Sequence, residues 1–318
     1  MLALARRAEN REFALQARNW RMLDLFELGD GDRVQTELDA YAALAAQVRL
    51  PSYSWYVPLW RATLAALAGR LDEGRDLAQR ARDLGRHAGD ANAEVFFQTH
   101  RYMCWLADER YEEWTGEALA FIEDKVNRSP AGLAYLAGIA TVFATTGRTE
   151  EARRALDIVA ADGFATVPRD MNWLSTMCSA AELCALLGDT ERARMLQPML
   201  RPYADRMAIS GRAAHHQGTV AYFLARLAAT LGDRTAADDL YTEAAQRDER
   251  AGAAIWVVRD LRRHAEFLLA HDDIGSALPL LERAARQANA AGLKRMLELI
   301  TAHRTTATDQ AASPTAVG

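Results

Sequence analysis

Two adjacent histidines, His215 and His216, form the most conspicuous polar pair in the sequence. Neighbouring residues of an α-helix point about 100° apart, so one metal ion cannot easily take both imidazoles as ligands. No Asp, Glu or Cys lies three or four residues away to complete a ligand set. We therefore expect no metal site here, and the pair either begins a solvated helix or makes hydrogen bonds inside a groove.

Other residue types with catalytic potential do not form a set that spacing can define. The chain contains no Gly-x-Ser-x-Gly or HExxH motif, and its three cysteines follow neither metal-ligand nor Cys-His spacing. Acidic pairs stand at expected helix starts, where a carboxylate offsets the helix dipole. A site assembled across distant segments stays open, so His215, His216 and Glu182 are weak catalytic candidates and no cofactor is expected.

The elements that would position such residues recur along the chain. A turn of the type apolar-Gly-Asp/Arg returns about every 40 residues, after one apolar helical run and before the next. Glycine suits this turn because a left-handed backbone costs it least. The turns with glycine are 28–30, 68–70, 146–148, 187–189 and 231–233, and 108–110 and 271–273 fill two further slots without it.

Small residues stand at fixed offsets from these turns, where two helices must approach closely. Alanine occurs five residues past the turn and again twelve residues past it, at positions 152, 193, 237, 277, 81, 244 and 284. The pattern predicts an all-α, tetratricopeptide-like helical-hairpin solenoid of about seven repeats over residues 1–304, with HEAT-like repeats as the structural alternative. Strand signals are absent. The tail, 305–318, lacks apolar periodicity and is expected to be disordered.

An aromatic-basic dipeptide marks the first three expected repeats at intervals of 40 residues, as Trp20-Arg21, Trp60-Arg61 and His100-Arg101. A shared register predicts that the three arginines lie at equivalent positions. Their charges would repel one another without acidic partners, so we expect carboxylates from neighbouring helices or, alternatively, an acidic ligand.

Tryptophan also favours the first helix of each expected hairpin, and Trp114 is the exception among seven. First helices line the concave face of a tetratricopeptide stack, so these residues either form the core between repeats or face a groove. Polar residues on the later first helices would give that groove a mixed charge. The candidate groove residues are Trp20, Arg21, Trp60, Arg61, Arg101, Trp173, Tyr222, Arg226, Trp256, Arg259, Arg262 and Glu266.

From RNWRMLDLFELGD onward the sequence resembles the tetratricopeptide region of large actinobacterial regulators, which are signalling ATPases with a DNA-binding or cyclase domain elsewhere in the chain. The likeness continues through SWYVPLWRATLAALAGRLDEGRDL and VPRDMNWL to about Lys294. It implies a sensor and protein-interaction arm. No GxxxxGK[ST] phosphate loop occurs, so the chain matches the arm without the ATPase.

Charge and hydropathy narrow the function classes further. The net charge is −5 with both signs interspersed, which argues against a nucleic-acid partner. No run of apolar residues approaches membrane length, and the N-terminus lacks a secretory pattern, so we expect a cytoplasmic protein without a membrane partner. The favoured function is a non-catalytic binding or sensor module that presents a groove to a protein or peptide segment. A small-molecule receptor and a stand-alone biosynthetic enzyme remain the alternatives.

Overall fold

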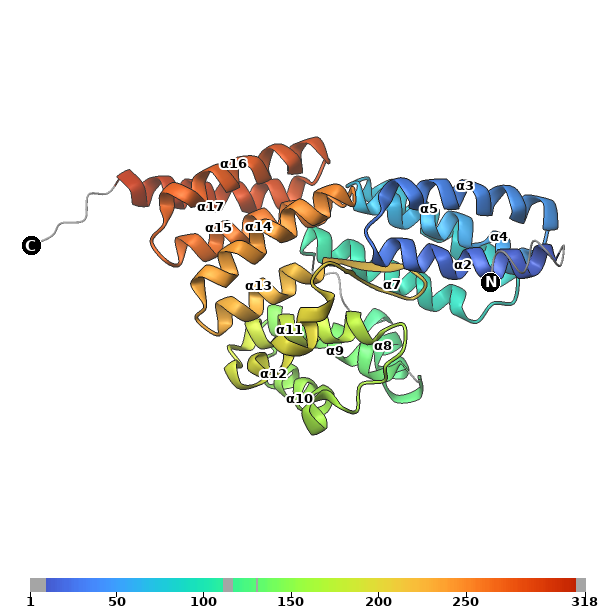
Figure 1. Ribbon diagram of the computed structural model, residues 1–318, viewed down its shortest axis with the longest axis horizontal. Coiled ribbons are helices and arrows are strands. Elements are labelled where there is room, and N and C mark those ends of the chain that lie inside the picture. The colour runs from blue at the N-terminus through green and yellow to red at the C-terminus, as the bar shows by residue number, and fades with distance from the viewer. Residues whose placement is uncertain (1–9, 111–116, 130, 313–318) are drawn as a thin grey trace, which may run out of the picture.

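The computed structural model describes residues 10–110, 117–129 and 131–312. Most of them are helical, and the helices pair into hairpins that stack one after another (Figure 1). The seven hairpins are α2 (Arg11–Glu27) with α3 (Gly31–Val48), α5 (Tyr56–Leu67) with α6 (Leu71–His87), α7 (Asn92–Asp108) with α8 (Glu117–Arg128), α9 (Gly132–Thr145) with α10 (Thr149–Val159), α11 (Trp173–Leu187) with α12 (Thr190–Leu200), α13 (Val220–Thr230) with α14 (Arg234–Arg250), and α15 (Ala254–Leu269) with α16 (Ile274–Ala290). The chain is an all-α helical repeat, as predicted.

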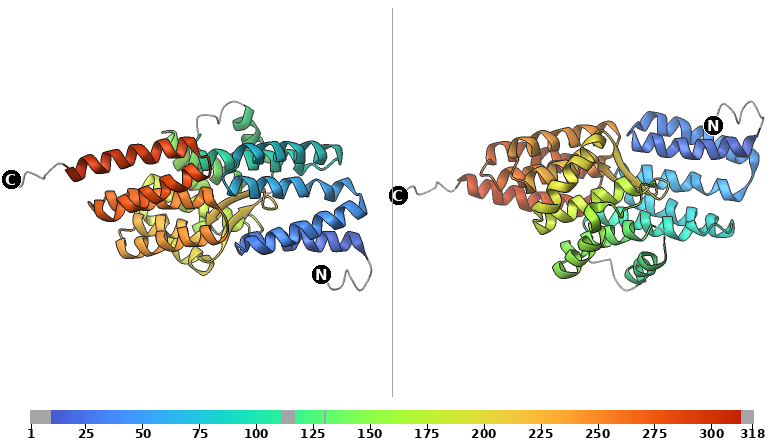
Figure 2. Two further views of the ribbon diagram at one scale, coloured as in Figure 1. Left: turned by 90° about the horizontal axis from the view of Figure 1, so that it is seen from above. Right: turned by 60° about the horizontal axis from the view of Figure 1, so that its bottom comes forward.

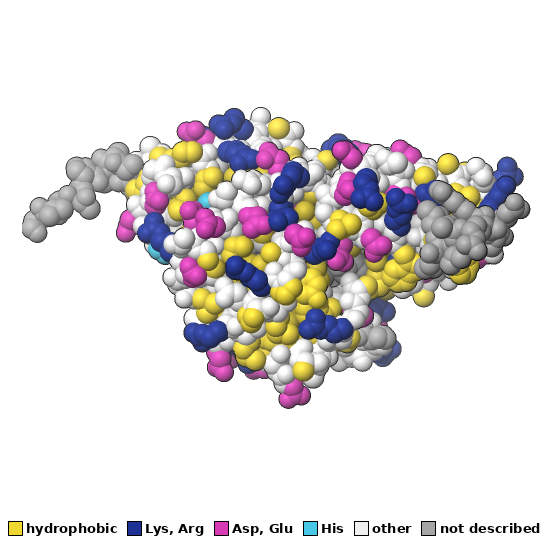
Figure 3. All heavy atoms as spheres, viewed as in Figure 1, with side chains coloured by type: hydrophobic (Ala, Val, Ile, Leu, Met, Phe, Trp, Pro, Cys, Tyr) yellow, Lys and Arg dark blue, Asp and Glu magenta, His cyan; other side chains and the backbone are white. Residues whose placement is uncertain are grey.

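Short helices and one final helix complete the helical elements. They are α4 (Pro51–Ser54), the 3-10 turns η2 (Ala161–Phe164) and η3 (Arg201–Tyr203), and α17 (Lys294–Ala312). Among the described residues, no helix combines the length and apolar character needed to cross a membrane. Figure 3 shows acidic and basic side chains scattered together over one face, with apolar side chains gathered near its middle.

The recurrent turn has two separate roles. Gly29 takes a left-handed φ of 67° and ends the first helix, and Asp30 then caps the second by accepting the Arg33 backbone N–H at 3.1 Å. The same cap recurs at Asp189, Asp233 and Asp273. At the last turn Asp272 adopts the left-handed conformation in place of glycine, with φ 60°.

The predicted small-residue positions are all buried. Ala81 retains 1% of its exposure and the other six alanines retain none. Each lies on a second helix, so its small side chain permits close packing on the first helix and on the next hairpin. The apolar interior is correspondingly continuous, since one cluster of buried residues runs from Leu15 to Ile300.

The stack closes on itself, because turns of the first two hairpins meet turns of the last ones. A Cβ placed on Gly69 would lie 2.5 Å from the Ala291 Cβ, and one on Gly31 would lie 3.2 Å from the Ala251 carbonyl oxygen. Figure 2 shows the α2–α7 arm beside the C-terminal helices in both views. The first helices therefore surround a central space instead of lining an open trough.

A two-stranded antiparallel hairpin interrupts the helical pattern between α12 and α13. Strand β1 (Met207–Ser210) pairs with β2 (His215–Thr219), with Ser210 opposite His215 and Ile209 opposite His216. The prediction that strands are absent was wrong here, and so was a solvated helix start at His215-His216. Nearly every residue of both strands is buried, so the hairpin has no solvent face and shows no alternating polarity in sequence.

The expected disorder of 305–318 was wrong as far as residue 312. Helix α17 continues through Ala312, and threonine hydroxyls donate back to carbonyls four residues earlier, including Thr305 to Thr301 at 3.1 Å. Extending an existing helix needs no new nucleation, so a segment without apolar periodicity can remain helical there. Residues 313–318 lie outside the described part of the chain.

Candidate functional site

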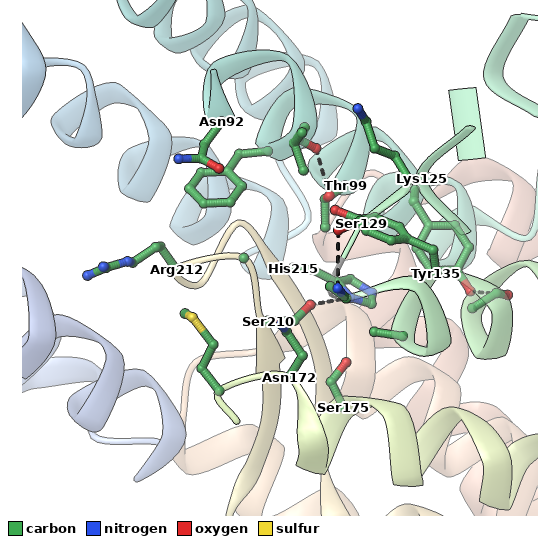
Figure 4. Close-up of a pocket in the computed structure, with 18 of the residues that line it drawn as sticks. Asn92, Thr99, Lys125, Ser129, Tyr135, Asn172, Ser175, Ser210, Arg212 and His215 are labelled. Carbon is green, nitrogen blue, oxygen red and sulfur yellow. Dashed lines mark hydrogen bonds between the residues drawn. The ribbon is translucent and has the colours of Figure 1, made fainter. Parts of the chain in front are cut away.

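A cavity of about 560 Å³ lies inside the ring of first helices. Helices α7, α8, α9 and α11 and the β-hairpin contribute to its wall (Figure 4). Its apolar surface includes Tyr56, Phe96, Ile139 and Met171, and its polar surface includes Asn92, Thr99, Lys125, Ser129, Tyr135, Asn172, Ser175, Ser210, Arg212, His215 and Gln217. Small-molecule sites in proteins fall in this size range and show the same mixture of apolar walls and few polar groups.

His215 is the cavity residue with the most altered chemistry. Its Nδ1 lies 3.2 Å from the Ser210 Oγ, and its ring centroid lies 5.2 Å from that of Tyr102. Burial lowers the pKa of His215 to about 3. The neutral ring can exchange hydrogen bonds, but so weak a base is poorly suited to accept a proton near neutral pH. This environment counts against the catalytic role considered for His215.

Neutral hydrogen-bonding groups form another part of the cavity wall. The Gln217 Nε2 donates to the Ser175 Oγ at 2.8 Å and to the Ser179 Oγ at 3.2 Å. All three side chains are buried. Both amide hydrogens of Gln217 are thus used within the protein, whereas the Ser175 hydroxyl hydrogen is not donated to any described residue. It is available to an acceptor in the cavity.

A second, smaller chamber of about 70 Å³ adjoins the cavity and shares Tyr102, Ser179 and Gln217 with it. Its wall includes Glu182, which accepts a hydrogen bond from the Arg226 Nε at 3.1 Å. Burial alone would raise the pKa of Glu182, but Arg226 and two further arginines outweigh it and lower that pKa. An ionised carboxylate paired in this way is a structural group, so Glu182 is a poor candidate for acid-base catalysis.

The ion pairs continue from this chamber toward the C-terminus. Glu109, which ends α7 with a left-handed φ of 51°, accepts from Arg262 and also from Arg263, the latter at 3.2 Å. The Glu266 carboxylate meets the same two arginines at 2.6 and 2.8 Å, and His303 of α17 lies 3.4 Å from it. These contacts join α7, α15 and α17 across the ring.

Two buried carboxyl groups hold the base of the β-hairpin. The Thr219 backbone N–H donates to the Asp248 Oδ2 at 3.2 Å, and the Arg259 Nη1 donates to the Gln217 carbonyl oxygen at 2.6 Å. The Arg259 guanidinium also meets Asp260 at 2.8 Å. Burial, and then the neighbouring Asp260, raises the pKa of Asp248 well above its usual range. One arginine serving two buried carboxyl groups favours retention of a proton on the pair.

The tip of the β-hairpin reaches the first two repeats. The Trp60 Nε1 donates to the Arg212 carbonyl oxygen at 2.9 Å, and the Thr63 Oγ1 donates to the Ala213 carbonyl oxygen at 2.7 Å. The Arg212 side chain donates to the Asn19 Oδ1 at 2.5 Å and lies 4.0 Å above the Trp20 ring. Arg212 and Ala213 both have positive φ, 58° and 62°, so these contacts hold a strained turn in place.

The three arginines of the repeated dipeptide meet different surroundings. Arg21 lies 3.5 Å from Glu37 of α3, which agrees with the expected pairing to a neighbouring helix. Arg101 stacks over the Trp105 ring at 4.7 Å and accepts no carboxylate among the described residues. Arg61 is exposed and forms no hydrogen bond or ion pair with any residue the structure describes. A shared register therefore does not give the three arginines a common partner.

The structure brings the other predicted groove residues together in two groups. Tyr222, Trp256 and Arg259 join Glu182 in the wall of the small chamber, next to Arg226, and Arg262 and Glu266 belong to the ion pairs beside it. Trp60, Trp173 and Trp256 are at most 5% exposed and serve as core, whereas Trp20 is 44% exposed. His216 is buried and its Nδ1 accepts the Gly218 backbone N–H at 3.0 Å. Trp114 lies outside the described residues.

Sequence reasoning missed most of the large cavity. One signal was present: Ser175 and Ser179 stand four residues apart on the otherwise apolar helix α11, and so share a face. Their partner Gln217 lies on β2, an element that the sequence did not predict. The cavity could not be assembled without that hairpin.

Comparison with known proteins adds little to this description. No family model matches the sequence, and no curated protein matches it. Among solved structures, a similar chain is described as a "Circular tandem repeat protein with novel repeat topology and enhanced subunit contact surfaces". It is 15% identical, and the match covers 98% of this chain and 89% of that one at a TM-score of 0.25. Such a low score carries no argument about function, and the fold rests on the hairpins themselves.

Proposed function

We propose that this chain is a receptor module that binds a small organic molecule in the 560 Å³ cavity. The cavity carries the proposal. Because the first and last repeats meet and the β-hairpin lies among the first helices, the interior offers an enclosed site of small-molecule size. The sequence left a peptide groove and a small-molecule receptor open, and this geometry favours the receptor.

The surroundings of the cavity support binding without catalysis. The groups with altered protonation are a neutral histidine of low basicity and carboxylates already committed to arginine partners. Among the described lining residues there is no pairing of a nucleophile with an available base. The fold is compatible with a binding module, and the resemblance to regulator arms agrees with this: occupancy of the cavity would be the signal that such an arm reports.

A cavity-filling substitution tests this function. Ala134 lines the cavity and Ala302 is exposed on α17, so Ala134→Trp and Ala302→Trp make a matched pair. Melting curves of both variants and the unchanged protein would be recorded against a collection of small metabolites. We expect some compounds to raise the melting temperature of the unchanged protein and of Ala302→Trp, but not of Ala134→Trp.

Two outcomes would count against the receptor. If stabilising compounds act equally on Ala134→Trp, they bind elsewhere. If no compound stabilises the protein while an arrayed peptide collection yields binders, the peptide-binding alternative replaces the receptor. The melting temperatures of the two variants without compound show whether the added indole has disturbed the fold.

A further inference from the structure

We propose that the cavity ligand is an organic acid: a small molecule with a carboxylate, phosphate or sulfate group joined to an apolar ring or chain. This inference rests on the proposed function and narrows its ligand class. It follows from the charges around the cavity, the hydrogen-bonding groups in its wall, and the contrast with the adjoining chamber.

The charged residues that line the cavity all carry one sign. Lys125, Arg128 and Arg212 contribute to the wall, and none of its described residues is Asp or Glu. The protein as a whole has the opposite balance, with 43 acidic against 38 basic Lys and Arg residues. A basic cavity in an acidic protein attracts anions, and its apolar walls strengthen that attraction by lowering the local dielectric constant.

Nearby carboxylates cancel only part of this charge. Lys125 and Arg128 lie 3.5 and 3.2 Å from one and the same carboxylate, Asp124. Arg212 instead meets neutral groups, the Asn19 amide oxygen and the Trp20 ring. No described carboxylate lies within ion-pair distance of Arg212. The rim of the cavity therefore keeps a net positive charge that a bound anion could neutralise.

The uncharged polar groups in the wall include several unused donors. The phenol groups of Tyr56 and Tyr135 make no hydrogen bond to described residues, and burial raises the pKa of each to about 12, so both keep their hydrogen. The Ser175 hydroxyl hydrogen is likewise unused, because its oxygen accepts from Gln217. A ligand rich in acceptor atoms satisfies these donors, and an acid group supplies acceptors of high capacity.

The smaller chamber provides an internal contrast. It is lined by Glu109, Glu182, Arg259 and Arg263, and each of these side chains has an ionic partner within the protein. Charge there is balanced by the chain itself and asks for no ligand. The excess of positive charge is thus a property of the large cavity, whose apolar residues such as Phe96, Ile139 and Met171 would contact the rest of the acid.

Sets of probes that differ in charge alone test the inference. Indoleacetate, indoleacetamide and tryptamine share one ring and are anionic, neutral and cationic at neutral pH, and naphthalene analogues give a second set. Affinities would be measured by isothermal titration and ligand-observed NMR with the unchanged protein, Ala134→Trp, Arg212→Met, Lys125→Met and Arg286→Met. Arg286 is exposed on α16 and does not line the cavity, so it is the control for loss of one positive charge.

We expect the acid of each set to bind at least tenfold more tightly than its amide, and the amine to bind most weakly. Arg212→Met or Lys125→Met should weaken the acid about tenfold, or about 1.4 kcal/mol, with little effect on the amide and none from Arg286→Met. Because Arg212→Met also removes the Asn19 contact, Lys125→Met provides the test if that variant fails to fold.

Different failures point to different proposals. If amides or amines bind in the cavity as well as acids do, and Ala134→Trp abolishes their binding, the receptor stands and the acid ligand is wrong. If both sets bind equally to Ala134→Trp, or do not bind at millimolar concentration, both the acid ligand and the use of this cavity are contradicted.

Discussion

The indole N–H of Trp60 donates a 2.9 Å hydrogen bond to the carbonyl oxygen of Arg212, a residue that lies 152 positions later in the chain. Trp60 belongs to the second repeat and Arg212 to the tip of the β-hairpin, so this bond ties the hairpin to the N-terminal arm. It also holds Arg212 in a left-handed conformation, with φ 58°, at the edge of the cavity.

Replacing Trp60 with phenylalanine should destabilise the protein beyond the loss of volume, because the Arg212 carbonyl would lose a buried partner. Trp55→Phe is the matched control: Trp55 is equally buried, but its Nε1 has no partner among the described residues. We expect Trp60→Phe to lower the free energy of unfolding by about 1–3 kcal/mol more than Trp55→Phe does. Urea denaturation followed by circular dichroism measures both, and equal losses would mean that the bond contributes nothing to stability.

Arg226 should be essential for the stability of the region around the small chamber. Its guanidinium pairs with Glu182 at 3.1 Å, and both side chains are at least four-fifths buried. Arg226→Met leaves a buried carboxylate without its nearest cation, and we expect a loss of about 3 kcal/mol. Arg192→Met removes an arginine whose partner Asp157 is largely exposed, and should cost under about 1 kcal/mol. Similar midpoints for the two variants in guanidinium chloride would refute this difference.

The sequence predicted the repeats because their causes are local. The left-handed Gly29, the Asp30 cap and the buried Ala237 each reflect the geometry of a single helical hairpin, and similar residues recur at each repeat. The β-hairpin has no such local cause. HHQGT contains few residues that favour strands, and its conformation depends on Trp60, Thr63 and Asp248, which lie far away in sequence.

The candidate site followed the same division. Glu182, Arg226 and Arg259 could be placed near one another because they lie on successive first helices at related positions. Ring closure could not be predicted, since it depends on how small angles between repeats accumulate along the stack. Without closure the concave face looks like an open groove, which explains why the sequence favoured a peptide and why the cavity residues Tyr135, Ser175 and Gln217 were missed.

Stability should fall as the pH is lowered from neutral, partly because of His216. Burial lowers its pKa to about 3 in the folded protein, whereas an unfolded histidine titrates near pH 6.5. Between these values the unfolded state binds more protons, so the stabilisation present above pH 6.5 is lost progressively toward pH 3. Each such histidine contributes a slope of about 1.4 kcal/mol per pH unit.

His216→Asn tests this slope, since the asparagine oxygen can still accept a hydrogen bond near Gly218. Unfolding free energies from urea titrations at pH 5.0, 5.5, 6.0 and 6.5 should depend less steeply on pH in this variant. His87 is exposed on α6, so His87→Asn should leave the slope unchanged. A slope that is the same in His216→Asn and the unchanged protein would show that His216 is not held neutral by burial.

Closure of the ring predicts that one glycine turn tolerates substitution much less well than another. Gly69 and Gly147 end the first helices of two repeats with similar φ angles, 88° and 81°, and an arginine follows each. Alanine therefore pays a comparable backbone penalty at both positions, about 1 kcal/mol. Their surroundings differ: a Cβ on Gly69 would lie 2.5 Å from the Ala291 Cβ and 2.9 Å from its carbonyl oxygen, whereas one on Gly147 meets nothing within 4 Å.

Gly69→Ala should accordingly force the α5–α6 turn away from the α16–α17 turn, at an added cost of about 1–3 kcal/mol. The loss of free energy of unfolding should be larger in Gly69→Ala than in Gly147→Ala, and amide hydrogen exchange should rise on both sides of the seam in Gly69→Ala alone. Because the cavity depends on that closure, ligand affinity should fall in the same variant. Equal stability and equal exchange in the two variants would mean that the first and last repeats do not pack against each other in solution.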